Sequence, residues 1–468
     1  MSGTFDPNIL TSDFRTPGER DRDKITFSQP FRALAGKAQV HSPETHDDIR
    51  SRLTHSLEVS CVAGSLGTHV AHAIGPEKIP TGLLPRDAQS IRNAVGAGAL
   101  MHDIGNTPFS HPGEEAVRLF FEKHPNGQKI ISHLPAEEQP AFLNFHGNMQ
   151  AFRIATTSGW KGSMNLTPLT LAAFCKYPTV RGVKTEGKPR RIGIFYSDRK
   201  EWRKIARELG LSPIKSARKI PRDPTASDDP DHHTHLDWHR HILSYITEAA
   251  DDICYLTADL EDAATLGIIS VSTVLNFLKS LCPSNIKTET PDNHRSIFHE
   301  DGMMYATETQ RERNMIRYYR SQAITQLILE CTEAAIKNRH KLLMPERYGI
   351  APSLMSEIAI QDKLKEIRNF SQKHIYDHRV STLMPGENTD PDNIHRMYKT
   401  CALMAQEILH PGSTSDDIRK VLDESCLDPA ANEAHKIVDA VTSLSDTAAT
   451  RLSGLCAPLG VATDLPTI

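Results

Sequence analysis

The sequence predicts an all-α protein. Hydrophobic residues recur at helical spacing over long stretches, and in residues 51–75 they are Leu53, Leu57, Val62, Leu66, Val70 and Ile74. Pro, Gly and Asn gather between such stretches, where they end helices. Strand-like sequence is limited to a short run at 191–196. We therefore expect a helical core, a helical C-terminal extension and a small insertion of loops and β-structure.

The composition narrows the class of protein. A chain of 468 residues can form one large helical domain with insertions, or two to three smaller ones. A formal net charge of −4 argues against binding nucleic acid through overall charge alone. No apolar run approaches the roughly 18 residues of a membrane-spanning helix, and the N-terminus lacks a secretory signal. The eight cysteines include no C-x-x-C pair, which favours free thiols and a cytoplasmic location.

The first half of the chain contains an arm, a helical core and an insertion. Residues 1–24 form the polar arm, and residues 25–284 form the core. Helices are expected in the core at 51–75, 87–102, 147–155 and 239–283. Residues 157–235 are rich in Gly, Pro, Lys and Arg and form the insertion, with a small hairpin. A helix at 198–209 within it should end at Gly210.

The second half, residues 285–468, is predicted to be a helical C-terminal region. Hydrophobic periodicity recurs there in four segments separated by Pro, Gly and Asn. The expected helices are at 310–340, 354–379, 391–409 and 429–457.

The most informative segment runs from His102 to Glu114. The adjacent His102 and Asp103 offer an imidazole nitrogen and a carboxylate oxygen to one divalent cation, a donor set that suits Zn, Mn, Fe or Co. His111 and Glu114 are three residues apart, so on a helical turn they share a face. Such a pair can act as a general acid and its orienting carboxylate beside a metal.

Two distant helices supply further candidates. His55 lies on the periodic helix at 51–75, although a helical histidine alone is more often an exposed or satisfied residue. Asp251, Tyr255 and Asp259 are four residues apart and share one helix face among small residues. That face alone fits a solvated surface equally well. With the His102-Asp103 pair, these segments provide two imidazoles and two carboxylates in the order His, His-Asp, Asp.

This order resembles the HD superfamily of metal-dependent phosphohydrolases. More narrowly, the chain is similar to the deoxyguanosine-triphosphate triphosphohydrolases (dGTPases) and to related deoxynucleotide triphosphohydrolases. The resemblance covers about residues 20–265, whereas 285–430 match only in helical character. The segments that carry it, in the order of the family, are 20–25, 31–40, 50–59, 102–114, 145–150, 176–178, 240–245 and 248–255. Near the C-terminus, residues 437–446 resemble a worn version of the segment that the family has there.

The resemblance implies an HD-domain helical core and a specific reaction. The family hydrolyses a deoxynucleoside triphosphate to the deoxynucleoside and inorganic triphosphate, with water attacking the α-phosphorus. The expected substrates are dGTP and other dNTPs. The reaction requires a divalent metal, with manganese or magnesium expected and cobalt, iron or zinc as alternatives. By the resemblance, the metal ligands are His55, His102, Asp103 and Asp251.

The resemblance also assigns roles around the metal. Asp251 is preferred to Asp252 as the ligand because Tyr255 and Asp259 then fall in phase with it. His111 would be the catalytic acid, and Glu114 would hold its tautomer and charge. The expected substrate-binding residues are Gln39, Arg52, Asn148, Lys176, Tyr177, Tyr255 and Asp259.

The sugar and phosphate ends of the substrate require different residues. Gln39 offers a donor and an acceptor to a 3′-hydroxyl. The ring of Tyr255 against C2′ would leave no room for a 2′-hydroxyl. Lys188, Arg190 and Arg191 form a further basic cluster, of which most members are expected on a solvated face.

The chain departs from the family at one informative position. His146 stands where relatives usually carry Glu or Asp before Gly-Asn. This change leaves the role of the acid in doubt and makes His146 a candidate phosphate contact or extra metal contact.

Two other functions remain as alternatives. The protein could be an HD phosphodiesterase or nucleotidase that acts on another phosphate ester. It could also be a regulatory, nucleic-acid-binding oligomer with a vestigial site. The family implies a homo-oligomer, a hexamer or tetramer, and in some members a nucleotide effector or single-stranded DNA as a partner. No membrane partner is expected.

Overall fold

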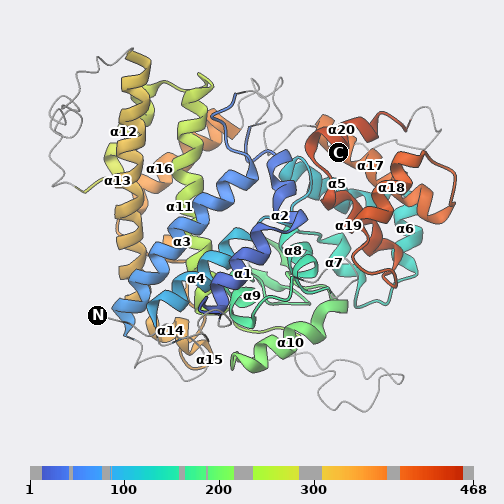
Figure 1. Ribbon diagram of the computed structural model, residues 1–468, viewed down its shortest axis with the longest axis horizontal. Coiled ribbons are helices and arrows are strands. Elements are labelled where there is room, and N and C mark those ends of the chain that lie inside the picture. The colour runs from blue at the N-terminus through green and yellow to red at the C-terminus, as the bar shows by residue number, and fades with distance from the viewer. Residues whose placement is uncertain are drawn as a thin grey trace, which may run out of the picture.

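The computed structural model is helical almost throughout (Figure 1), so the predicted all-α fold is confirmed. It describes residues 13–41, 46–75, 85, 87–157, 164–185, 188–214, 236–283, 308–376 and 391–456. In these residues the only sheet is an antiparallel ribbon of β1 (Val183–Thr185) and β2 (Lys188–Arg191). No helix in the described ranges combines the length and the apolar character that a bilayer crossing requires.

Long helices form one side of the molecule and surround the first apolar cluster (Figure 1). They are α3 (Arg52–Ile74), α4 (Ala88–Leu100), α11 (Ile242–Thr265), α12 (Val271–Leu281), α13 (Glu308–Lys337) and α16 (Gln361–Ser371). The starts of α3 and α4 are fixed by side-chain caps, because Ser51 accepts the N–H of Thr54 and Asp87 accepts that of Ser90. These caps set where His55 lies on α3 and where α4 ends before His102.

A second apolar cluster joins segments that are far apart in the sequence. Helices from the first third of the chain pack there against the C-terminal helices, on the right of Figure 1. The members are α5 (Ser110–Lys123), α6 (Pro125–Ser132), α7 (Gln139–Leu143), α17 (Pro391–Leu409), α18 (Asp416–Ser425), α19 (Glu433–Ser443) and α20 (Asp446–Ser453). The C-terminal helices therefore pack against α5, the helix that carries His111.

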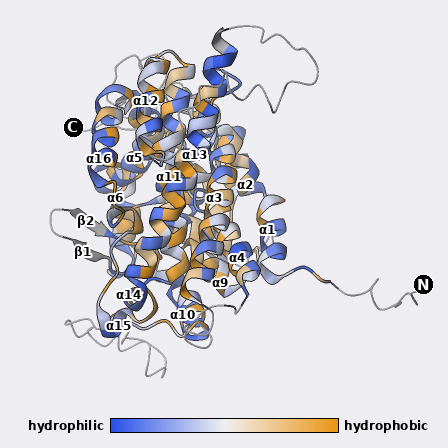
Figure 2. Cartoon of the chain, turned by 90° about the vertical axis from the view of Figure 1, so that its left-hand side faces the viewer, coloured by the Kyte–Doolittle hydropathy of each residue, from blue (hydrophilic) through white to orange (hydrophobic). Residues whose placement is uncertain are grey.

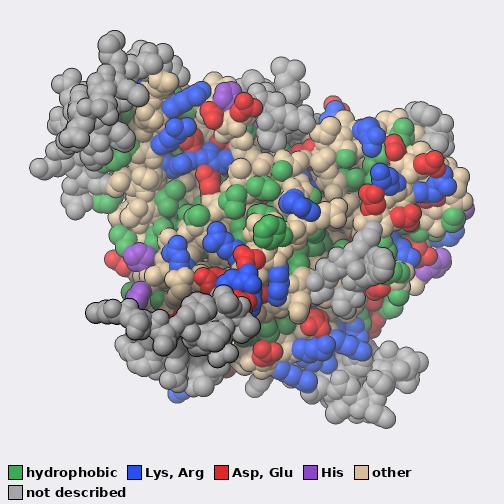
Figure 3. Space-filling view, in the orientation of Figure 1, with side chains coloured by type: hydrophobic (Ala, Val, Ile, Leu, Met, Phe, Trp, Pro, Cys, Tyr) green, Lys and Arg blue, Asp and Glu red, His purple; other side chains and the backbone are tan. Residues whose placement is uncertain are grey.

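A third apolar cluster lies beneath the insertion. It is built around α1 (Pro17–Thr26), α2 (Gln29–Ala33), α8 (Gly147–Thr156), α9 (Pro168–Phe174) and α10 (Arg199–Glu208). Helix α1 packs against α4. Figure 2 shows hydrophobic residues gathered in the middle of the helical body and hydrophilic residues along its outer faces. Basic and acidic side chains are interspersed on the face drawn in Figure 3.

Short elements connect the larger helices. They are the turns at Leu34–Gly36, Tyr196–Asp198 and Leu354–Ser356, the helices α14 (Arg339–Leu343) and α15 (Pro345–Tyr348), and a π-helical turn at Gln372–Tyr376 that extends α16.

Two predicted helices are each divided in the structure. The helix expected at 239–283 breaks between α11 and α12, where Gly267 has a φ of 71° and Ser270 caps the next helix. The helix expected at 429–457 breaks between α19 and α20. Ser445 begins α20 there by accepting the N–H of Ala448. Periodicity alone cannot detect such breaks, because the apolar pattern continues across them.

Two further boundaries were also predicted wrongly. The strand expected at 191–196 is instead β2, which ends at Arg191. The chain leaves the ribbon because Gly193 and Ile194 both donate their N–H groups to the carbonyl of Thr179. The helix expected at 354–379 begins only at Gln361, and residues 377–379 lie outside the described part.

Gly105 allows the segment after α4 to lie directly on α8. A Cβ at this position would overlap the backbone nitrogen of Ala151 and the carbonyl oxygen of Gly147. The contact brings the residues after His102 against the start of α8. Any side chain at position 105 would therefore push the two segments apart.

Replacing Gly105 with Ala should lower the free energy of unfolding by about 3 kcal/mol, a cost typical of severe overpacking. Urea unfolding followed by circular dichroism measures this change. Gly96→Ala is the matched control, because a Cβ at position 96 meets only Ser60, at 3.4 Å or more. It should be neutral or slightly stabilising, since Ala favours a helix interior. Equal stability of both variants would contradict the contact.

Candidate active site

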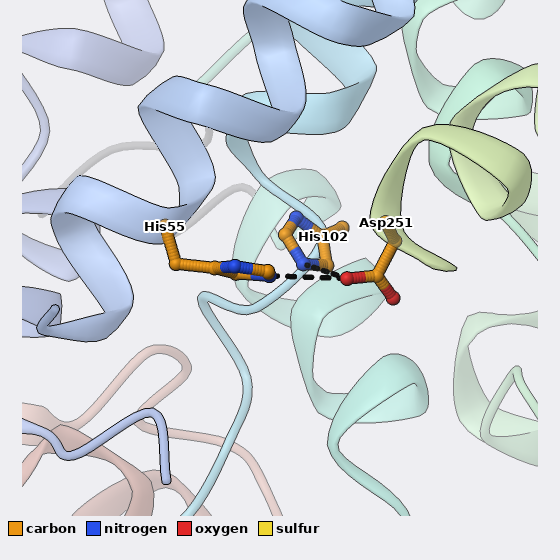
Figure 4. Close-up of side chains that lie close together, drawn as sticks. All are labelled: His55, His102 and Asp251. Atoms are coloured by element: carbon orange, nitrogen blue, oxygen red, sulfur yellow. Dashed lines mark hydrogen bonds and ion pairs between the residues drawn. The ribbon is translucent and has the colours of Figure 1, made fainter. Parts of the chain in front are cut away.

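Three predicted metal ligands meet where α3, α4 and α11 converge. His55 comes from α3, His102 follows α4 and Asp251 comes from α11, and Figure 4 shows their side chains pointing toward one another. Nε2 of His55 lies 3.0 Å from Oδ1 of Asp251, and Nε2 of His102 lies 3.5 Å from the same oxygen. One ligand atom from each residue lies within 4.8 Å of the other two, so the group can hold one metal ion.

The orientation of His102 suits a metal ligand. Its Nδ1 lies 2.6 Å from the carbonyl oxygen of Ala99, which can only accept, so Nδ1 carries the proton. The other nitrogen, Nε2, is buried and makes no hydrogen bond to another described protein atom. A backbone carbonyl that fixes the tautomer in this way is a common feature of metal-bound histidines.

The donor set carries negative charge that favours a bound cation. Burial opposes a charged imidazole, but the carboxylates of Asp103 and Asp251 outweigh it and raise the pKa of His102 to about 9. Burial likewise opposes a charged Asp251, but His102 and His55 hold the pKa of that carboxyl well below its usual range. The residues present therefore fit a divalent metal, and the electrostatic environment favours it.

Asp103, the fourth predicted ligand, lies beside this group. Its Oδ2 is 3.5 Å from Nε2 of His102 but also accepts a hydrogen bond from Nη1 of Arg52 at 2.7 Å. Its Oδ1 accepts from the side-chain amide of Asn106 at 2.7 Å. Burial would raise the pKa of Asp103, yet the Arg52 guanidinium keeps it below the ordinary value. The carboxylate is thus charged, and its role as a ligand stays a prediction.

The loop that precedes His111 has an unusual backbone. Phe109 and Ser110 have φ values of 60° and 59°, a left-handed conformation that costs non-glycine residues about 1 kcal/mol or more each. Asp446 at the start of α20 holds this loop by accepting the N–H of Phe109 at 3.0 Å. Ser110 Oγ accepts from Nη2 of Arg52 at 2.5 Å. These contacts fix the point from which α5 presents His111.

His111 and Glu114 interact as the sequence predicts, and His146 joins them. Nδ1 of His111 lies 3.3 Å from Oε2 of Glu114. Oε1 of Glu114 accepts the N–H of Gly147 at 2.6 Å and lies 3.8 Å from Nδ1 of His146. Burial opposes a charged Glu114, but His146, His111 and the Gly147 N–H hold its pKa well below the usual range. A charged, buried carboxylate therefore faces two imidazoles.

Tyr255 and Asp259, two of the predicted substrate-binding residues, both interact with Tyr376. The ring of Tyr255 stacks on that of Tyr376, with centroids 5.5 Å apart and planes 25° apart. Oη of Tyr376 donates to Oδ2 of buried Asp259 at 2.6 Å. Burial and the Asp259 carboxylate both raise the pKa of Tyr376, so the phenol stays protonated. Sequence reasoning missed Tyr376, because nothing in the local pattern at 372–376 links it to Tyr255.

These groups surround a cavity of about 290 Å³. His102, Asp103 and Asp251 line it. Six of the seven predicted substrate-binding residues line it as well: Gln39, Arg52, Asn148, Lys176, Tyr177 and Tyr255. Asp259 is held behind the cavity by Tyr376. The Oε1 atom of Gln39 is buried without a hydrogen-bond partner among the described residues, so it can accept a hydrogen bond from a ligand.

Several lining residues escaped the sequence analysis. Glu248 pairs with Nζ of Lys176 at 3.0 Å and with Nη1 of Arg240 at 2.7 Å. Arg191 lines the cavity as well, although the residue is exposed, as the sequence analysis expects for most of this basic cluster. The side chains of Lys188 and Arg190 lie outside the described part of the structure. The sequence places Glu248 one helical turn before Asp251, and this spacing could have identified it.

Comparison with known proteins agrees with this geometry. The HD domain family matches residues 52–167. A deoxyguanosinetriphosphate triphosphohydrolase-like protein of Pseudomonas aeruginosa is 33% identical over 340 residues, which cover 72% of this chain and 68% of the relative. A protein of the same description from a Synechocystis species is 30% identical over 376 residues, 78% of this chain and 76% of the relative.

A third relative, named deoxyguanosinetriphosphate triphosphohydrolase, comes from Yersinia enterocolitica. It is 31% identical over 287 residues, 54% of this chain and 51% of the relative. With the metal-binding geometry, the length of these matches identifies the chain as a member of the deoxyguanosinetriphosphate triphosphohydrolase-like family of HD-domain proteins.

Proposed function

We propose that this protein is a metal-dependent hydrolase that converts deoxynucleoside triphosphates, dGTP among them, into the deoxynucleoside and inorganic triphosphate. The observation that carries the proposal is the meeting of His55, His102 and Asp251 beside the cavity that is lined by His102, Asp251 and the His111–Glu114 pair. Metal ligands beside a positioned acid are what a phosphate-ester hydrolase requires. The names of the relatives point to the triphosphate substrate.

His55, His102 and Asp251 would hold the metal ion, with Asp103 as the proposed fourth ligand. A divalent cation in this position supplies Lewis acidity toward a phosphoryl oxygen and lowers the pKa of water. Manganese and magnesium are the expected metals, and the nitrogen-containing donor set also suits cobalt, iron and zinc. Arg52 holds Asp103 in place and lies on the cavity wall, where it can meet the α-phosphate.

His111 delivers a proton to the leaving 5′-oxygen in this proposal. Because its Nδ1 faces Glu114, the proton that it transfers belongs to Nε2. The Glu114 carboxylate stabilises the charged imidazole before transfer, and the N–H of Gly147 keeps that carboxylate in place. Glu114 thus fixes both the orientation and the charge of the acid.

The sugar would lie against Tyr255, with Gln39 at its 3′-hydroxyl. The stack on Tyr376 keeps the Tyr255 ring in one position, so the ring forms a rigid wall. A wall against C2′ excludes a 2′-hydroxyl, which gives preference for deoxynucleotides.

Product analysis tests the proposal directly. Purified protein is incubated with each of the four dNTPs, singly and in pairs, with manganese or magnesium, and the phosphate products are separated by anion exchange. Intact triphosphate supports the proposal. Orthophosphate or pyrophosphate would instead favour a phosphodiesterase or nucleotidase. No turnover under any condition would favour a regulatory oligomer, for which binding of single-stranded DNA and a hexamer or tetramer in solution are the readouts.

Replacing Asp251 with Asn should weaken manganese binding roughly 100-fold or more, because it removes a charged ligand. Metal content after dialysis, measured by elemental analysis, gives the result. Asp252→Asn is the matched control, since this neighbouring acid is absent from the metal-binding group of the described residues. If Asp252→Asn lost the metal and Asp251→Asn kept it, the assignment of the ligand would be wrong.

Replacing His111 with Ala should retain the metal and lower kcat by about 10²–10⁴-fold, the usual contribution of a general acid. Both quantities are measured on the same sample. His69→Ala is the control, because His69 is an exposed histidine on α3. It should behave like the wild type. A fall in metal content for His111→Ala would make this residue a ligand and not the acid.

Replacing Tyr255 with Ala should lower the preference for dGTP over GTP about tenfold, because it removes the ring beside C2′. The ratio of kcat/KM for the two nucleotides measures the preference. Tyr255→Phe keeps the ring and should keep the preference. An unchanged ratio in the Ala variant would remove Tyr255 from the sugar site.

A further inference from the structure

One carboxylate of the C-terminal region joins the two loops that carry Gln39 and His111. Oδ2 of Asp446 accepts the N–H of Ala38 at 2.9 Å, and Oδ1 accepts the N–H of Phe109 at 3.0 Å. Ala38 directly precedes Gln39, and Phe109 lies two residues before His111. Both oxygens of Asp446 therefore hold loops that are far apart in the sequence.

The backbone at Phe109 needs such a support. Phe109 and Ser110 both have positive φ values, 60° and 59°. Residues other than glycine stay in this left-handed region only where surrounding contacts hold them there. The carboxylate of Asp446 provides one such contact, and Ser110 Oγ provides another by donating to the carbonyl oxygen of Ala38 at 3.4 Å. Without these contacts, the loop would relax to a more common conformation, and His111 would shift with it.

The start of α20 packs closely against the first of these loops. A Cβ on Gly36 would lie 2.7 Å from Cβ of Ser445, the residue that caps α20. The side chain of Lys37 is buried, and its Nζ donates to the carbonyl oxygens of Thr442 and Asn106, each at 2.6 Å. Thr442 lies near the end of α19, and Asn106 belongs to the second loop. The junction between α19 and α20 is therefore connected to both loops.

The metal-binding group depends on other parts of the fold. His55 and Asp251 come from α3 and α11, and His102 follows α4. The two hydrogen bonds of the Asp446 carboxylate end on the two loops instead. A change at Asp446 should therefore displace the acid and leave the metal ion in place.

We propose that Asp446 is a positioning residue that holds the His111 loop at a fixed spacing from the Gln39 loop. The inference rests on the proposed function and gives the C-terminal region a part in the same reaction. A proton donor must lie within hydrogen-bond reach of the leaving oxygen, and a displacement of about 1 Å can lower the rate about 100-fold. A carboxylate bonded to both loops fixes the distance between the acid and the sugar that Gln39 would bind.

A double-mutant cycle with His111 tests the inference. Asp446→Asn keeps the shape of the side chain, but its NH2 group cannot accept the second N–H. It should lower kcat for dGTP about 10- to 100-fold and leave the metal content unchanged. In the His111→Ala background, the same substitution should change kcat by less than about twofold, because the acid through which Asp446 acts is absent. A purely structural role would lower kcat by the same factor in both backgrounds.

Two further variants complete the design. Asp416→Asn is the matched control, because Asp416 is also the first residue of a C-terminal helix, α18, but its side chain is 94% exposed. It should behave like the wild type. Gly36→Ala disturbs the same contact without removing a charge, because the added Cβ meets Ser445. It should lower kcat in the wild-type background only. If thermal unfolding shows that Asp446→Asn does not fold, the cycle of Gly36→Ala with His111→Ala decides.

Hydrogen exchange followed by mass spectrometry gives a readout that needs no turnover. In Asp446→Asn, the amides of segments 36–40 and 106–111 should exchange about tenfold faster or more, because both loops lose a common anchor. The amides of α3 and α11 around His55 and Asp251 should keep their exchange rates.

The outcomes separate this inference from the proposed function. Unchanged kcat and exchange in Asp446→Asn, equal losses of kcat in both backgrounds, or loss of the metal would each overturn the role of Asp446. Faster exchange of the two loops in a protein that hydrolyses no dNTP would keep Asp446 as the residue that holds them and reject the proposed reaction. Hydrolysis of dNTPs that does not depend on Asp446 would do the reverse.

Discussion

The meeting of Asp251 with two histidines is the constraint on which the rest of the structure depends. Even a partly buried carboxylate such as that of Asp251 is costly unless opposite charges or hydrogen bonds surround it. The two histidines come from α3 and from the segment that follows α4. These two helices and α11 must therefore approach one another at the point where the three side chains meet. Small residues permit this approach: a Cβ on Gly67 of α3 would lie 2.7 Å from Cγ1 of Val95 on α4. The packing of the helices and the geometry of the donor group therefore depend on each other.

The C-terminal region supports the site, although it lies wholly outside the segment matched by the HD family. Asp446 accepts the N–H groups of both Ala38 and Phe109, next to Gln39 on one side and close to His111 on the other. The ammonium group of Lys37 donates to the carbonyls of Asn106 and Thr442, each at 2.6 Å. Burial is the largest influence on Lys37 and lowers its pKa to about 7. Lys37 and Asp446 thus connect α19 and α20 to the loop that presents the candidate acid.

The sequence predicts the parts of this site that depend on local spacing. The placement of Asp251, Tyr255 and Asp259 on one helix face, and the interaction of His111 with Glu114, follow from helical geometry and appear in the structure. Family resemblance brings together His55 and His102, which periodicity cannot do. Tyr376 escapes the sequence analysis, and Asp446 enters it only as the end of a worn family segment, because their contacts join segments more than 100 residues apart. The helix breaks at Gly267 and Ser445 were missed because the apolar pattern continues across them. A single turn residue causes the first break and a single cap residue the second.

Negative and positive side chains occupy different parts of the cavity, a distribution that suits both a cation and a polyanion. The acidic side chains Asp103 and Asp251 face the histidines, where a divalent ion fits. Positive charge gathers around Tyr177, where Nζ of Lys176 lies 5.7 Å and the guanidinium carbon of Arg191 lies 5.3 Å from the centre of the ring. Glu248 balances Lys176, whereas the described carboxylates include no ion-pair partner for Arg191. The helical core therefore supplies a donor group that suits a cation, and the β1–β2 ribbon adds positive charge to the wall of the same cavity.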